Sequence, residues 1–326
     1  MKKLIYLLLI LCPIAVCAQQ SWEKSSPLDL MWQNIGNAGF STGQAGCLSL
    51  ALNPSGEPFV AFRDGMNPSK VTVMKFDGTN WMNVGNAGFS AGGTNFLSLK
   101  FSPSGQPYVA FQDEGNANKE TVMKFDGTNW VNVGAAGLSV GQVQFTNLAF
   151  SPTDSLPYVA FQDGGNLNKA TVMKFNGSSW INVGAAGFSK GKAQYTSFAF
   201  SPADNLPYIA FQDGGNANKA VVMKFNGTTW ANVGTAGFSA GMAYSISFAF
   251  NPVDSLPYIA YSDDEYSYKA TVMKFNGTNW VNVGIADFSA KETDYTSLAF
   301  SPSGQPYVAY EDGGNLFKAT VISALI

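Results

Sequence analysis

Residues 196–234 contain the pattern that decides the fold: TSFAFSPADNLPYIAFQDGGNANKAVVMKFNGTTWANVG. Four short segments in this stretch are rich in aromatic and β-branched residues, at residues 196–201, 207–213, 219–225 and 229–234, and turn-forming residues separate them. Segments of this composition and length are typical of β-strands joined by tight turns. Asn226-Gly227, between the last two segments, tolerates the positive φ angles of a hairpin. The stretch therefore predicts a four-stranded antiparallel meander.

The same text recurs along the chain with a period of about 50 residues. The tryptophans that begin the fourth segment are spaced by 49, 49, 50, 50 and 50 residues: Trp32, Trp81, Trp130, Trp180, Trp230 and Trp280. A sheet with apolar residues on both faces needs a neighbour on each side, and radial stacking of several such sheets provides it. We therefore predict an all-β fold over residues 31–326, a six-bladed β-propeller of four-stranded antiparallel blades.

The two ends of the repeat region complement each other. The repeats begin with a lone fourth segment, residues 31–36 (MWQNIG), and end on a third segment, residues 318–325 (KATVISAL), with no tryptophan after it. Each of the four segment types then occurs six times. We expect the N-terminal strand to complete the sixth blade and to close the ring.

The repeat resembles those of known propeller families. Its period, the Gly-Gly after the second segment (Gly164-Gly165) and the spacing of Phe175 and Trp180 resemble kelch repeats. The phrase SLAFSPSGQPYVA, residues 297–309, is similar to the first two strands of WD40-type repeats, and the whole text is similar to secreted repeat propellers of bacteria. No single activity follows from this resemblance, because these families share a fold and not a function.

The first 18 residues have the features of a signal peptide. Lys2 and Lys3 precede an apolar run at residues 4–16, and the small residues Val16 and Ala18 suit cleavage after Ala18. Residues 19–30 would then form a short N-terminal lead. A lipid anchor at Cys17 is the alternative. No later stretch is apolar for the roughly 18 residues that a membrane helix needs, so we expect a secreted protein, extracellular or in the cell envelope, without a membrane span.

The composition argues against several classes of function. Without Lys2 and Lys3 the chain has 17 basic and 22 acidic residues and a single arginine, Arg63, so we do not expect it to bind nucleic acid. It has no histidine, which excludes a Ser-His-Asp triad and a His-ligated metal site. Cys47 is the only cysteine after the signal peptide, and we interpret its position, which holds aromatic residues in other repeats, as core. We expect a monomer without disulfides.

Two groups of residues recur in every repeat, and a structural role is the first interpretation for both. The aspartates that end the second segment should cap turns and pair with lysines about six residues later. The tryptophans should pack between neighbouring blades. Repeated ligand pockets, with tryptophans that stack on sugars as in propeller lectins, are the alternative. The aspartates are Asp64, Asp113, Asp163, Asp213, Asp263 and Asp312.

The fifth repeat departs from the others in two loops. SDDEYSYK at residues 262–269 replaces the usual QDGGNANK, and DFSAKETD follows at residues 287–294. Both loops are expected on one face of the propeller, side by side. The candidate ligand-binding residues are therefore Asp263, Asp264, Glu265, Tyr266, Tyr268, Asp287, Glu292 and Asp294. Because calcium prefers carboxylate oxygens, we hypothesise a Ca²⁺ site at Asp263, Asp264, Glu265 and Asp287, and no other cofactor. Drift of a solvated surface is the alternative.

These observations favour a non-catalytic binding module for a glycan or a protein, with its site on the face that carries the two loops. The leading alternative is a glycoside-type hydrolase that uses carboxylates of the fifth repeat, since paired carboxylates can act without histidine. A structural spacer in a surface assembly is the third interpretation.

Overall fold

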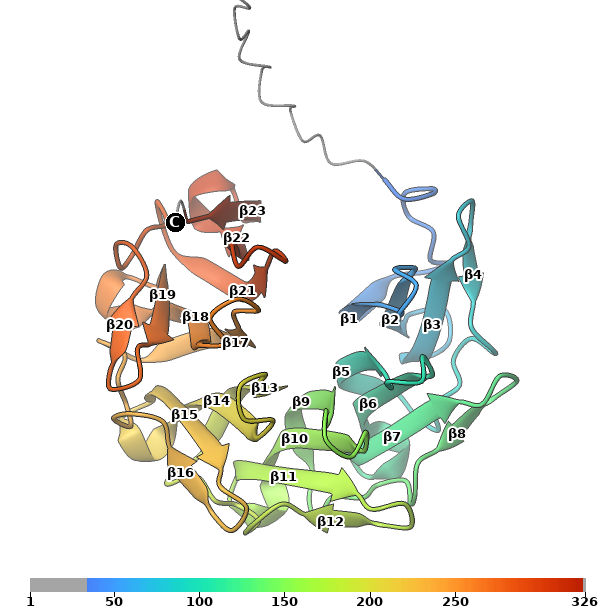
Figure 1. Ribbon diagram of the computed structural model, residues 1–326. Coiled ribbons are helices and arrows are strands. Elements are labelled where there is room, and N and C mark those ends of the chain that lie inside the picture. Colours follow the sequence, from blue (N-terminus) through green and yellow to red (C-terminus); the bar gives the residue numbers. More distant parts are fainter. Residues whose placement is uncertain (1–33, 325–326) are drawn as a thin grey trace, which may run out of the picture. The chain divides into compact units, whose positions relative to one another are not determined.

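The computed structural model describes residues 34–324 of the chain. Nearly all of them belong to one compact unit, Gly36–Ile326, which consists of six consecutive antiparallel sheets (Figure 1). Five sheets have four strands and the last has three. Among the described residues, no helix is long and apolar enough to span a membrane. The unit is a six-bladed β-propeller, as predicted.

The strands follow the repeat. Blade 1 contains β1 (Ala45–Leu52), β2 (Pro58–Asp64), β3 (Lys70–Phe76) and β4 (Trp81–Asn83). Blade 2 contains β5 (Thr94–Phe101), β6 (Pro107–Asp113), β7 (Lys119–Phe125) and β8 (Trp130–Asn132). Blade 3 contains β9 (Val143–Phe150), β10 (Pro157–Asp163), β11 (Lys169–Phe175) and β12 (Trp180–Asn182). Blade 4 contains β13 (Ala193–Phe200), β14 (Pro207–Asp213), β15 (Lys219–Phe225) and β16 (Trp230–Asn232). Blade 5 contains β17 (Ala243–Phe250), β18 (Pro257–Asp263), β19 (Lys269–Phe275) and β20 (Trp280–Asn282). Blade 6 contains β21 (Thr293–Phe300), β22 (Pro306–Asp312) and β23 (Lys318–Ser323).

The strand pairing within a blade is that of the predicted meander. In blade 4, Ala193 pairs with Asp213, Asp213 pairs with Lys219, and Phe225 pairs with Trp230. Residues 31–36 were predicted to form the strand that closes the ring. Met31, Trp32 and Gln33 of this segment are outside the described residues, so ring closure stays a prediction.

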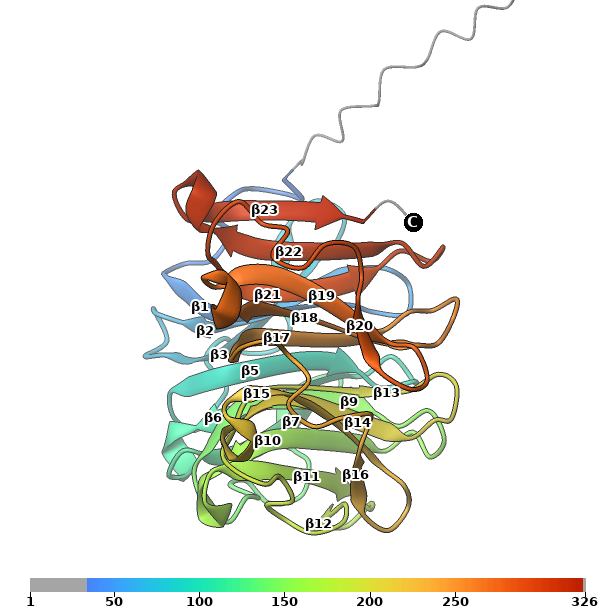
Figure 2. The ribbon, with the colours of Figure 1, turned by 90° about the vertical axis from the view of Figure 1, so that its left-hand side faces the viewer.

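A short 3-10 turn joins the second and third strands in five blades. These turns are η1 (Glu114–Asn116), η2 (Gly164–Asn166), η3 (Gly214–Asn216), η4 (Asp264–Tyr266) and η5 (Gly313–Asn315). Figure 2 shows them together on one side of the unit. Because the first strand of a blade begins beside the end of the second, the loops that enter the first strands lie on this side too. We call it the turn face.

The repeated aspartates cap these turns, as predicted. Asp163 accepts hydrogen bonds from the amide of Gly165 (2.9 Å), from Asn166 Nδ2 (2.7 Å) and from Thr171 Oγ1 (3.1 Å). The predicted ion pairs with the lysines that follow are wrong. The ion pairs within residues 34–324 are Lys174 with Asp154, Lys224 with Asp204 and Lys269 with Asp287. The turn amides and hydroxyls occupy the aspartate oxygens instead.

The tryptophans of the middle blades pack between blades, as predicted. Trp280 is 8% exposed, its indole N–H donates to the carbonyl of Val233 in the preceding blade (2.7 Å), and its ring stacks on Phe238 with centroids 4.4 Å apart. Trp130 and Trp230 repeat this arrangement with Val84 and Val183. Each tryptophan therefore joins two blades by one hydrogen bond and a large buried area.

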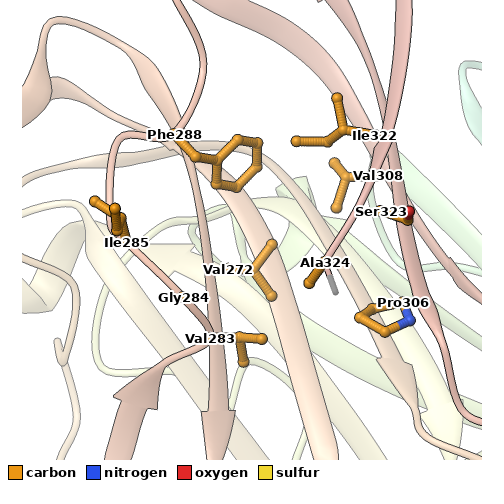
Figure 3. Close-up of a pocket in the computed structure, with 10 residues that line it drawn as sticks. All are labelled: Val272, Val283, Gly284, Ile285, Phe288, Pro306, Val308, Ile322, Ser323 and Ala324. Atoms are coloured by element: carbon orange, nitrogen blue, oxygen red, sulfur yellow. The ribbon is translucent and has the colours of Figure 1, made fainter. Parts of the chain in front are cut away.

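The corresponding place between blades 5 and 6 is an apolar cavity of about 280 Å³ (Figure 3). Val283 and Phe288 there correspond in the repeat to Val233 and Phe238, which hold Trp280. Val272, Val308 and Ile322 also line it. Repeat alignment assigns this position to Trp32, which lies outside the described residues.

Candidate functional site

The first strand of every blade contains a β-bulge at its third residue. The third residues have positive φ angles between 48° and 56°, and the pairing with the second strand shifts at this point in each blade. They are Cys47, Phe96, Phe145, Tyr195, Ser245 and Tyr295. Positive φ is rare for bulky residues, and a bulge re-aims the side chain of the extra residue. The bulge is therefore a repeated feature of the blade that turns these side chains out of the regular alternation of the strand.

The bulge residues of five consecutive blades line one cavity of about 410 Å³, which we call the axial cavity. Because β5, β9, β13, β17 and β21 surround the centre of the unit in Figure 1, a cavity that all five line lies on its axis. The rings of Phe96 and Phe145 are 5.2 Å apart by their centroids, and those of Phe145 and Tyr195 are 5.1 Å apart. Adjacent aromatic side chains thus form part of its wall.

Polar groups lie between these rings. Asn147 Nδ2 donates to the carbonyls of Thr196 (2.7 Å) and Phe145 (2.8 Å). The Ser245 hydroxyl donates to the carboxylate of Asp294, which also accepts from the amide of Tyr295 (2.8 Å). The axial cavity therefore combines aromatic faces with a few hydrogen-bonding groups, which is typical of small-ligand sites.

A second cavity, of about 300 Å³, adjoins the axial cavity and is called here the side cavity. Tyr195 and Asp294 line both. Its other lining residues are Tyr244, Tyr268, Glu292, Thr293, Glu311 and Phe317. Burial, followed by the charge of Asp294, raises the pKa of Tyr195, so its phenol stays neutral around neutral pH. Burial and the neighbouring Tyr268 likewise raise the pKa of Tyr244.

Three of the residues singled out in the fifth repeat line this side cavity: Tyr268, Glu292 and Asp294. The two divergent loops lie side by side, because the amide of Thr293 donates to the carbonyl of Tyr268 (2.8 Å). The ring of Tyr268 lies 5.4 Å from that of Tyr244, measured between centroids.

The other five residues line neither cavity. Asp263 is buried and accepts from the amides of Gly241 (2.9 Å) and Glu265 (3.2 Å), and its burial raises its pKa. Asp264 accepts from the amide of Met242. Asp287 lies 3.8 Å from Lys269 Nζ. Glu265 is exposed and Tyr266 is half-buried in η4.

These carboxylates point to separate partners. Within residues 34–324 no group of three or more His, Cys, Asp or Glu side chains is placed to hold a metal ion. The calcium site at Asp263, Asp264, Glu265 and Asp287 stays a prediction, to which the arrangement of these side chains adds no support.

The bulge residues were missed because their position looks like the start of a buried strand. The interpretation of this position as core is wrong: Tyr295 is 75% exposed, and Phe96, Phe145 and Tyr195 are half-buried around the axial cavity. The sequence contained no clear signal for this. The position varies between Cys, Phe, Tyr and Ser, but the residue before it varies as much, from Gly46 in blade 1 to Tyr244 in blade 5.

A buried carboxyl group behind the axial cavity was also missed. Glu120 in β7 is fully buried; its Oε2 accepts from Thr146 Oγ1 (2.8 Å), and Oε1 has no partner. Thr146 in turn lines the axial cavity. Burial raises the pKa of Glu120 well above its ordinary value. The sequence signal for it was a glutamate in the third strand of blade 2 (KETVMKF), at a position where blades 3 and 5 have alanine (KATVMKF).

No protein-family model and no curated protein sequence matches the chain. Solved structures that are similar to it include the Aleuria aurantia lectin in complex with Fucα1-6GlcNAc, at 18% identity and a TM-score of 0.54, covering 85% of this chain and 91% of the lectin. AofleA from Arthrobotrys oligospora matches at 15% identity and a TM-score of 0.55, over 88% of each chain. An α-L-arabinanase of Penicillium chrysogenum, complexed with arabinobiose, matches at 11% identity and a TM-score of 0.53, over 89% of this chain and 95% of the enzyme. At these identities the likeness shows a shared six-bladed propeller fold.

Proposed function

We propose that this protein is a non-catalytic glycan-binding module whose site is the axial cavity on the turn face. The observation that carries the proposal is the set of aromatic bulge residues, Phe96, Phe145, Tyr195 and Tyr295, around one cavity of about 410 Å³. Aromatic faces stack on the C–H faces of sugar rings, and the interleaved hydroxyl, amide and carboxylate groups can bind sugar hydroxyls. Two propellers of similar fold were solved with saccharides, which supports this class of ligand.

Binding without hydrolysis suits the carboxylates of the axial cavity. Glycoside hydrolysis ordinarily needs two carboxyl groups on opposite sides of the scissile bond. Asp294 is the one carboxylate among the residues that line the axial cavity, and it is engaged by the Ser245 hydroxyl and the Tyr295 amide. It is therefore better placed to hold a ligand hydroxyl than to exchange protons with a substrate.

A glycoside-type hydrolase remains the second candidate, favoured by the three carboxylates around the side cavity, Glu292, Asp294 and Glu311. If a bound oligosaccharide releases reducing ends, and if this release is lost in Glu292→Gln and Glu311→Gln, the protein is a hydrolase. Unchanged oligosaccharide after long incubation supports the binding module.

The test of the proposed function is a glycan array probed with the mature protein, followed by calorimetry with the best ligand. We expect Tyr195→Ala to weaken binding roughly 10-fold or more, the size of effect that loss of an aromatic stacking partner produces. Leu167→Ala is the control, because Leu167 is 80% exposed beside η2 on the same face and lines neither cavity. Absence of glycan binding, or equal affinity of the Tyr195 variant, would contradict the proposal.

The proposal includes export. Residues 1–18 are expected to be removed, so the secreted protein should begin at Gln19. Mass spectrometry of the protein from the culture medium or cell envelope checks this, and a mass that includes residues 1–18 would contradict it.

A further inference from the structure

The side cavity differs from the axial cavity in its charge. Its lining has three carboxylates, Glu292, Asp294 and Glu311, and four aromatic rings, those of Tyr195, Tyr244, Tyr268 and Phe317. No lysine or arginine is among the residues that line it. The cavity is therefore strongly acidic and at the same time aromatic.

Two of these carboxylates repel each other within blade 6. Asp294 in β21 and Glu311 in β22 are direct cross-strand partners. The same pair of positions holds neutral amides in blades 2–4, for example Asn95 with Gln112 and Gln194 with Gln212. Like charges directly opposite each other destabilise a sheet. Blade 6 thus replaces a neutral pair by a repulsive one at the edge of a cavity.

No ion pair within residues 34–324 offsets this repulsion. Neither Glu292 nor Glu311 takes part in an ion pair within residues 34–324. Asp294 is bound by Ser245 and Tyr295 but by no basic group. A ligand that carries positive charge would relieve the repulsion, whereas a neutral ligand would not.

The aromatic rings indicate which kind of cation fits. The centroids of Tyr195 and Tyr244 lie 6.0 Å apart, and those of Tyr244 and Tyr268 lie 5.4 Å apart, so three rings form a continuous wall. Ring faces attract ammonium groups through cation–π interactions. A calcium ion prefers six to eight oxygen ligands, which an aromatic wall does not supply. An organic ammonium group therefore suits this lining better than a metal ion.

We propose that the side cavity binds a protonated amino group, and that the ligand of this protein is an amino sugar with a free amine. The inference rests on the proposed glycan-binding function. Tyr195 and Asp294 line both cavities, so a sugar ring in the axial cavity can place its amino group against the side cavity. The axial cavity binds the saccharide, and the side cavity selects the charged form of its substituent.

The experiment uses three β-1,4-linked oligosaccharides of equal length that differ only at the 2-position: oligomers of glucose, of N-acetylglucosamine and of glucosamine. Calorimetry is run with the mature protein at about pH 5.5, where amines and most carboxylates are charged. We expect the glucosamine oligomer to bind roughly 10-fold more tightly than the other two, and this preference to weaken as salt is added.

The variant Glu311→Gln restores the amide that blades 2–4 have at this position. It should lower the affinity for the glucosamine oligomer to near that for the glucose oligomer, and it should change the affinity for the glucose oligomer far less. It should also raise the melting temperature of the free protein, because the repulsion with Asp294 is removed. Glu57→Gln, which changes an exposed glutamate in a turn of blade 1, is the control for a change of net charge.

The outcomes separate this inference from the proposed function. If the glucose and glucosamine oligomers bind with equal affinity, and Tyr195→Ala removes the binding of both, the amine preference is overturned and the proposed glycan-binding function is kept. No binding of any of the three, together with an empty glycan array, would overturn both. A preference for the glucosamine oligomer that persists in Glu311→Gln and Glu292→Gln would overturn the assignment to the side cavity.

Discussion

The buried carboxyl group of Glu120 predicts an unusual dependence of stability on pH. The side chain is fully buried, one oxygen accepts from Thr146 and the other has no partner. Burial therefore raises the pKa of Glu120 well above its ordinary value. The change that tests this is Glu120→Gln, which keeps the volume and the acceptor for Thr146 and removes the ionisable group.

The sign of the effect follows from the protons bound in each state. The unfolded chain loses the Glu120 proton at about pH 4.3, whereas the folded protein keeps it to a higher pH. Above pH 4.3 the folded state thus binds more protons, so this group makes the protein less stable as pH rises, until the folded pKa is passed. Every unit by which the pKa is raised corresponds to about 1.4 kcal/mol at high pH.

The size of the effect is set by the unpartnered oxygen. A buried polar group without a partner costs about 1–3 kcal/mol, and more when it is charged. We expect Glu120→Gln to change stability little at pH 4 and to raise it by at least about 1 kcal/mol at pH 8. Thermal and urea unfolding at both pH values measure this, with the exposed Glu57→Gln as control. If the difference in the free energy of unfolding between the variant and the wild type is the same at pH 4 and pH 8, the reasoning is refuted.

Three further changes test the structural roles of repeated residues. Trp280→Ala removes a buried indole bonded to Val233 and should cost about 3–5 kcal/mol in urea unfolding, and a cost below about 1 kcal/mol would contradict packing between blades. Asp163→Ala uncaps η2 and should cost about 1–3 kcal/mol, whereas Asp287→Asn breaks only a half-exposed ion pair with Lys269, at a cost below about 1 kcal/mol. Equal costs would contradict the capping role. If residues 31–36 close the ring, Trp32→Ala should lower the melting temperature as Trp280→Ala does. Trp22→Ala, which lies upstream of the repeats, should leave the melting temperature unchanged. Identical melting temperatures of the Trp32 and Trp22 variants would contradict ring closure.

The blades could be predicted from the sequence because every local signal agrees in six copies. In blade 4 the second and third strands, Pro207–Asp213 and Lys219–Phe225, have the predicted bounds. The aspartate caps were predictable as well, since Asp followed by Gly-Gly-Asn is a turn signal on its own. The partners of these aspartates were not, because Thr171 reaches Asp163 across the sheet and only the register shows which side chains meet.

The candidate site was predicted in part. The turn face and three residues, Tyr268, Glu292 and Asp294, were found from the departure of the fifth repeat. Glu311 was missed because its text, YED, differs from the usual FQD by conservative-looking changes, and its opposition to Asp294 exists only through strand pairing. The bulge was missed because an aromatic residue at positive φ has no sequence signature, and periodicity assigns it to a regular strand.

The bulge position explains how a repetitive protein acquires an asymmetric site. Its backbone conformation is the same in six blades, and in blades 2–6 its side chain lines the axial cavity, so substitutions there change the cavity while the bulge is kept. Blades 2 and 3 supply Phe96 and Phe145, whereas blades 5 and 6 supply Ser245 and Tyr295 beside Asp294. One side of the axial cavity is therefore apolar and the other is polar and opens onto the acidic side cavity. A ligand that matches both sides needs an apolar face and a positively charged substituent in one molecule, and the protonated amino sugar that we propose combines the two.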